Sequence, residues 1–241
     1  MSTLILRRLV VAGALLAPSA ATAASLVIVT VSAPDINCVF DTDCTITVTD
    51  SIGDIPIPAL TAGAARLQSR TFTGQPGSQA AGKTGYEYRV DLSTAVTSNE
   101  FSCVTDLAID FGAVTKLHYD RTRPQDDAFV VTQGGLGTIG ILFAEQTGNV
   151  ITFTFSQPVC AGNTPGTGQS TFFFGLASEF APKAIIAHVG VPGELPADVK
   201  ARAPSHPRRP VPIALPDQPP ASDQPPASQP VSAPGEPAPS R

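Results

Sequence analysis

Hydrophobic and polar residues alternate along most of the chain between residues 25 and 190. In the segment 86–92, Tyr86, Tyr88, Val90 and Leu92 alternate with Glu87, Arg89 and Asp91. A period of two predicts a β-strand, with the apolar set facing a core and the charged set facing solvent. Other alternating or β-branched segments predict strands at 25–31, 44–50, 66–73, 104–111, 116–119, 128–132, 138–143, 150–156, 170–176 and 183–189.

Turns rich in glycine and proline separate these segments, as at 74–77, 134–135 and 162–166. Such residues supply the positive or fixed φ angles that tight turns need. Only two short stretches, 58–67 and 194–201, have a pattern compatible with a helix. About ten strands with little helix predict an all-β fold, an antiparallel β-sandwich, with a β-barrel or jelly roll as the alternative.

The first 23 residues have the pattern of a secretory signal peptide. Arg7 and Arg8 precede an apolar run at 9–17, and Ala21-Thr22-Ala23 has the form of a cleavage site. The run is too short for a transmembrane anchor, and no later segment is long enough to span a membrane. We therefore expect a bacterial protein that is secreted to the periplasm or the cell exterior.

Composition changes near the C-terminus. Residues 191–241 contain 15 of the 24 prolines, whereas all 12 Phe and all 3 Tyr lie between Phe40 and Phe180. A segment without aromatic groups cannot bury enough apolar surface to fold, so we predict a proline-rich disordered tail over 191–241. The predicted organisation is a signal peptide at 1–23, a β-sandwich domain at 24–190 and this tail.

Four cysteines follow the predicted signal peptide, and an even number in a secreted chain indicates disulfides. Three pairings are possible. We favour Cys38–Cys44, which closes a short polar loop, and Cys103–Cys160, which links the start of one strand to the end of another. A metal site is disfavoured because no C-x-x-C spacing occurs.

The charge pattern narrows the choice of partners. Residues 25–190 carry 8 basic and 15 acidic groups, and no stripe of Lys and Arg interleaved with aromatic residues is present. An acidic domain repels phosphate backbones, so nucleic-acid binding is disfavoured. The absence of Trp also counts against stacking on sugar rings.

The residues that catalysis needs are scarce. His118 and His188 are the only His in the predicted domain, and no G-x-S-x-G motif is present. Asp106 and Asp110 share a strand face about 13 Å apart, beyond the separation of about 5–9.5 Å that glycoside hydrolysis needs. We predict that the protein is not an enzyme. A secreted hydrolase using His118 or His188 is a remote alternative.

An acidic loop is the best candidate for a metal site. Asp120, Asp126 and Asp127 could offer oxygen ligands to Ca²⁺, although Arg121 and Arg123 occupy positions where further acidic ligands would be expected. The short loop containing Asp41 and Asp43 is a weaker candidate. No other cofactor is predicted.

Several segments resemble a group of secreted bacterial β-rich, sandwich-like proteins. They are 71–77 (TFTGQPG), 86–92, 130–137 (VVTQGGLG), 151–160 (ITFTFSQPVC) and 172–178 (FFFGLAS). That group has no established activity, and its members often end in a surface-sorting segment, which is replaced here by the proline-rich tail. The resemblance implies secretion and a β-rich fold, and it carries over no catalytic residue.

These observations predict a secreted, non-enzymatic structural or adhesion-type protein of the bacterial envelope or exterior, with an envelope or surface protein as partner. Within 172–174, alternation places Phe173 on the opposite face from its neighbours, where it would be buried or would contact that partner. The alternative is a module that binds a glycan or small ligand through the loop at 120–127, with or without Ca²⁺.

Overall fold

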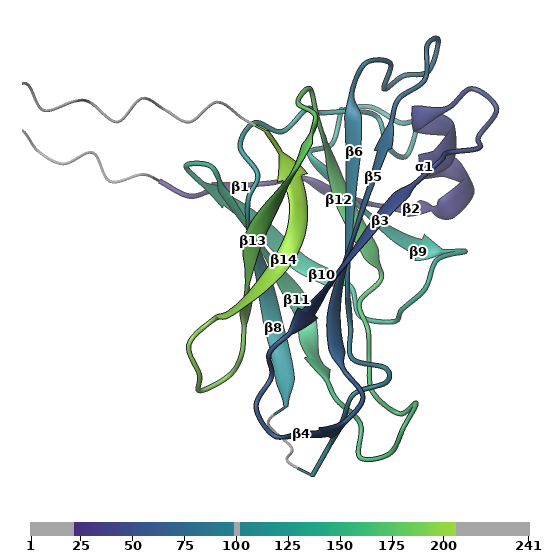
Figure 1. Ribbon diagram of the computed structural model, residues 1–241. Helices are drawn as coiled ribbons and strands as arrows, with labels where there is room; N and C mark the ends of the chain where they lie inside the picture. Colours follow the sequence, from purple (N-terminus) through teal and green to yellow (C-terminus); the bar gives the residue numbers. More distant parts are fainter. Residues whose placement is uncertain (1–21, 99–101, 206–241) are drawn as a thin grey trace, which may run out of the picture. The chain divides into compact units, whose positions relative to one another are not determined.

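Two stacked six-stranded sheets make up the fold in the computed structural model, which describes residues 22–98 and 102–205 (Figure 1). All strand pairs are antiparallel except β2 with β9. The first sheet has the order β1 (Ala24–Ser25), β10 (Ile141–Thr147), β11 (Val150–Cys160), β8 (Cys103–Asp110), β13 (Pro182–Gly190) and β14 (Ala197–Pro204). The second has the order β2 (Ile28–Ser32), β9 (Ala128–Gln133), β12 (Phe173–Ser178), β6 (Thr84–Asp91), β5 (Ala65–Thr73) and β3 (Thr49–Ile55).

Both sheets have two open edges, so the described strands form the predicted sandwich and not a closed β-barrel. A separate two-stranded pair, β4 (Leu60–Ala62) with β7 (Val96–Thr97), accompanies the two sheets. The expected all-β class is therefore confirmed.

The main core lies between the sheets and contains the apolar side of β6. Tyr86, Tyr88 and Val90 are fully buried, as the alternation predicted. At the centre is Phe174, whose ring centroid lies 4.8 Å from that of Phe153 on the opposite sheet. The Tyr88 hydroxyl donates a 2.8 Å hydrogen bond to the carbonyl of Arg202 on β14, so this buried polar group is satisfied across the two layers.

A helix that the sequence analysis did not predict, α1 (Ala33–Phe40), creates a second apolar cluster. Its first turn is capped by Ser32, whose hydroxyl accepts a 3.2 Å hydrogen bond from the Asp35 N–H, and Pro34 lies in that same turn. Both features are favourable helix-start signals. The helix lies against the outer face of the second sheet (Figure 1), where its buried residues join a cluster that includes Phe72, Phe129 and Phe173.

Four other predicted elements were wrong. The strand expected at 44–50 begins at Thr49, and 116–119 forms isolated bridges rather than a strand. Both stretches with helix-compatible patterns belong to strands, 58–67 to β4 and β5 and 194–201 to β14. Short windows with mixed patterns do not separate helix from strand, because cross-strand pairing decides the outcome.

The predicted domain boundary at residue 190 also needs correction. Strand β14 pairs with β13 along its whole length, from Val189 opposite Ala197 to Pro182 opposite Pro204. Its alternate residues are buried against the core, namely Ala197, Val199, Ala201 and Ala203. Prolines flank this strand and raise the local proline count, so composition alone groups the strand with the tail.

Cys103 and Cys160 form the predicted disulfide, at paired positions on β8 and β11. The predicted signal peptide up to residue 21 and the predicted tail from residue 206 lie outside the described residues. Within 22–98 and 102–205, no helix has the length and apolar character needed to cross a membrane.

Candidate functional site

A pocket lies where α1 meets the outer face of the second sheet. It has a volume of about 350 Å³, which lies within the range of about 300–1,000 Å³ for small-molecule sites. Three covering segments and the sheet form its walls. The helix contributes Ala33, Ile36 and Asn37, the segment before β3 contributes Ile46 and Val48, the turn after β9 contributes Gly134, Gly135 and Leu136, and the sheet contributes Arg70, Glu87, Val131 and Phe173.

Glu87 is the acidic group of this pocket. It lies on the charged side of β6, which we expected to face solvent, yet only 4 % of the residue is exposed. The expectation failed because α1 and the segment before β3 cover this part of the sheet. No described residue forms a hydrogen bond or ion pair with the Glu87 carboxylate, although its oxygens are not among the fully buried side-chain atoms without a partner, which are Arg89 Nε and Asp126 Oδ2.

Burial also changes how Glu87 ionises. Desolvation raises the pKa of its carboxyl group from 4.5 to about 7. The charge of Arg70 opposes this rise, whereas that of Asp50 reinforces it. Glu87 therefore changes its ionisation near neutral pH, where a small change in surroundings alters its charge.

Arg70 lies directly opposite Glu87 in the strand register, yet it pairs with another residue. Its Nε donates a 2.9 Å hydrogen bond to Oδ1 of Asp50, its register partner on β3. Its guanidinium carbon lies 4.1 Å from the centroid of the Phe173 ring, a cation–π contact. Arg70 is thus held in place by Asp50 and Phe173 and leaves Glu87 without a salt bridge.

Phe173 was expected either to be buried or to contact a partner protein on its own face of β12. It is 4 % exposed, because Arg70 and α1 cover that face. Its ring now forms part of the pocket wall. Of the two alternatives expected for Phe173, burial within the chain is the one that the structure shows.

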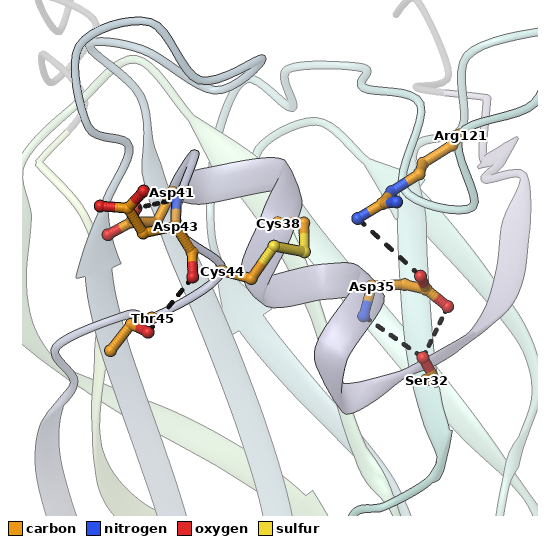
Figure 2. Close-up of a disulfide and its surroundings, with 8 residues drawn as sticks. All are labelled: Ser32, Asp35, Cys38, Asp41, Asp43, Cys44, Thr45 and Arg121. Carbon is orange, nitrogen blue, oxygen red and sulfur yellow. Dashed lines mark hydrogen bonds and ion pairs between the residues drawn. A yellow bond between two sulfur atoms is a disulfide. The ribbon is translucent and has the colours of Figure 1, made fainter.

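The predicted Cys38–Cys44 disulfide is confirmed, and it joins two of the pocket walls (Figure 2). Cys38 lies on α1 and Cys44 precedes the segment that carries Ile46 and Val48. The carboxylate of Asp41 accepts a 2.8 Å hydrogen bond from the Asp43 N–H within the loop between the cysteines. At the other end of α1, Asp35 pairs with Arg121 at 3.9 Å.

Removing this disulfide is expected to destabilise the fold moderately. Replacing Cys38 and Cys44 with serine should lower the free energy of unfolding by about 2 kcal/mol, because the closed loop is short. The measurement is urea denaturation of the double variant beside the wild type, with and without reductant. A variant as stable as the oxidised wild type would contradict a clamping role for this disulfide.

The predicted Ca²⁺ ligands occupy one loop but do not form a shared site. Asp120 accepts hydrogen bonds from the N–H and hydroxyl of Thr122, which lower its pKa, and Asp127 pairs with Lys116 at 3.0 Å. Asp126 is buried, and desolvation raises its pKa. Within the described ranges, no group of three or more His, Cys, Asp or Glu is placed to hold a metal ion. The Ca²⁺ site stays a prediction.

The two candidate His are occupied by other contacts. Nδ1 of His118 lies 2.7 Å from the carbonyl of Thr122, and Nδ1 of His188 lies 2.8 Å from Oδ1 of Asp198 on an exposed strand face. Asp106 accepts a 2.8 Å hydrogen bond from the neighbouring Thr105 hydroxyl. None of these side chains lines the pocket.

Glu87 and Arg70 lie in no sequence motif that marks them as site residues. Alternation does place both on one face of neighbouring strands, but it does not show that this face is covered. The signal that could have revealed the cover is the helix start at Ser32-Ala-Pro-Asp35.

Comparison of the chain with protein-family models, with curated proteins and with solved structures gave no match.

Proposed function

We propose that this protein is a secreted, non-catalytic ligand-binding protein, and that the pocket between α1 and the second sheet holds a small amphiphilic molecule. The observation that carries the proposal is Glu87, a largely desolvated residue that lines the pocket and forms no hydrogen bond or ion pair with the described residues. Burying a polar group without a partner costs free energy. A ligand that donates a hydrogen bond to Glu87 would remove that cost.

The walls favour a ligand with an apolar body. Apart from Arg70, Glu87 and Asn37, the lining consists of glycine, alanine, aliphatic residues and Phe173. Sites for small molecules commonly combine apolar walls with a few convergent polar groups. Because the Cys38–Cys44 disulfide joins two walls, much of the pocket exists before a ligand arrives, which lowers the entropic cost of binding.

The chemistry of the lining supports binding rather than catalysis. It contains no Ser, Thr, Cys, Lys, His or Tyr, so Glu87 is the only lining side chain of a type that serves as a nucleophile in covalent catalysis. The single carboxylate also lacks the second carboxylate that glycoside hydrolysis uses.

Two disulfides support export to an oxidising compartment, as the N-terminal pattern predicts. The periplasm or the cell exterior of a bacterium is the proposed location, in keeping with the resemblance to secreted bacterial proteins. A structural or adhesive role for the domain stays a prediction.

Ligand-observed NMR can test the proposal with benzyl alcohol, benzylamine and benzoate as probes. We expect at least one probe to bind the wild type. The affinity of that probe for the Asn37→Trp variant should be at least about tenfold lower, because tryptophan fills the pocket with a large side chain. Asn37→Ala, which removes the same amide without filling the space, is the matched control. If the Asn37→Trp variant binds the probes as tightly as the wild type does, the pocket is not their binding site and the proposed function is wrong.

A further inference from the structure

Two opposite charges face the pocket without pairing. Arg70 and Glu87 are register partners on β5 and β6, and both line the pocket. Side chains in this relation are near enough to interact directly. No Arg70–Glu87 salt bridge forms within 4.0 Å in the described residues, because Arg70 turns toward Asp50 instead. Both charged side chains thus line the pocket without forming a salt bridge to each other.

Each of the two groups retains unused hydrogen-bonding capacity. The Arg70–Asp50 bond uses Nε, and no described residue bonds the two terminal nitrogens of the guanidinium. Those nitrogens can donate to a carboxylate in the two-pronged geometry that arginine favours. The Glu87 carboxylate can accept from an ammonium group, and it accepts no hydrogen bond from the described residues.

The other charged groups near this point already have partners, and the nearest of them is Asp50, which is bonded to Nε of Arg70 and raises the pKa of Glu87. The helix offers Asn37 and the segment before β3 offers only Ile46 and Val48. Arg89, two residues along β6 from Glu87, forms an ion pair with Asp91, in which Nη1 lies 2.9 Å from Oδ2. The charged residue of α1, Asp35, pairs with Arg121 instead.

We infer that the pocket binds an α-amino acid with an apolar side chain, whose ammonium group is bound by Glu87 and whose carboxylate is bound by Arg70. This inference rests on the ligand-binding function proposed above. The apolar side chain would contact Phe173, Ile36 and Val131. A volume of about 350 Å³ lies at the small end of ligand pockets, which suits a single amino acid.

Three probes that differ by one charged group test this assignment by calorimetry. They are L-phenylalanine, 2-phenylethylamine, which lacks the carboxylate, and 3-phenylpropionate, which lacks the ammonium group. We expect L-phenylalanine to bind at least about tenfold more tightly than either truncated probe, because each loses a charge-assisted hydrogen bond.

Two substitutions test which residue binds which charged group of the ligand. Glu87→Gln should weaken the binding of L-phenylalanine and 2-phenylethylamine by about tenfold but leave the binding of 3-phenylpropionate unchanged. Arg70→Gln should weaken the binding of only the two probes that carry a carboxylate, L-phenylalanine and 3-phenylpropionate. Arg66→Gln is the matched control, since Arg66 lies on the same face of β5 but pairs with Asp54 on an exposed surface. Circular dichroism confirms that each variant is folded.

Binding of the ammonium group should also depend on pH. Glu87 must lose its proton to pair with a cation, and its pKa is about 7. The affinity for L-phenylalanine is therefore expected to fall by about tenfold or more between pH 7.5 and pH 5.5, and this fall should disappear in Glu87→Gln.

The outcomes separate this inference from the proposed function. If either truncated probe binds as tightly as L-phenylalanine, the pocket does not recognise both charges and the inference is wrong. If benzyl alcohol binds but none of the three charged probes does, the inference fails while the proposed function holds. If no probe of either set binds, the proposed function fails as well.

Discussion

Replacing both Cys103 and Cys160 with serine is expected to lower the free energy of unfolding by about 4 kcal/mol. The bond closes a loop of 57 residues, and the loss of unfolded-state entropy on cross-linking grows with loop length. The two cysteines already oppose each other in the register of β8 and β11, so the native strands need not move to form the bond. A loss of this size is a large part of the stability of an ordinary domain.

Urea denaturation of the double variant and of the oxidised wild type measures this effect. The matched control is the Cys38→Ser/Cys44→Ser variant, whose loop is only 6 residues long and whose expected loss is about half as large. If the long-range bond contributes no more stability than the short one, loop closure is not the source of its effect.

Replacing Glu87 with glutamine is expected to make the unliganded protein more stable above neutral pH, by up to about 3 kcal/mol. Burial raises the folded-state pKa of Glu87 to about 7 from its ordinary 4.5. The folded state therefore holds this proton more tightly than the unfolded state does. The wild type has its full stability below about pH 4.5 and loses part of it as the pH rises toward 7. Glutamine stays neutral, so the variant should not show that loss.

The measurement is the free energy of unfolding at pH 4.5, 6 and 8 for the wild type and for Glu87→Gln. The two proteins should be similar at pH 4.5 and diverge as the pH rises. Glu145→Gln, which removes an exposed carboxylate from β10, is the control and should follow the wild type. If the free energy of unfolding depends on pH in the same way for the wild type and for Glu87→Gln, ionisation of Glu87 is not the cause of the loss of stability.

The Glu87→Gln substitution is expected to have opposite effects on the stability of the unliganded protein and on the affinity for a ligand. The same substitution should stabilise the empty fold at pH 8 and weaken the binding of an amino acid. A residue that lowers stability while completing a binding site is expected where function conflicts with stability. A merely structural role for Glu87 would not produce both results.

Much of the fold could be predicted from local patterns. Alternation in β6 correctly placed Tyr86, Tyr88 and Val90 in the core, because a strand has a period of two whatever its neighbours are. The even number of cysteines indicated disulfides, and their positions favoured the pairing that the structure shows. The same alternation did not reveal that Glu87 is buried, since the cover comes from α1, roughly fifty positions earlier in the chain.

The sequence by itself determined the all-β class and the inward side of most strands, and it favoured one of the three possible cysteine pairings, because these follow from spacing along the chain. Only the tertiary structure decided the order of the strands and the position of α1 over the second sheet. It also decided the meeting of Arg70, Glu87 and Phe173 at one pocket. Such contacts join residues far apart in sequence, and their free energy depends on the packing of both sheet faces, which no local pattern encodes.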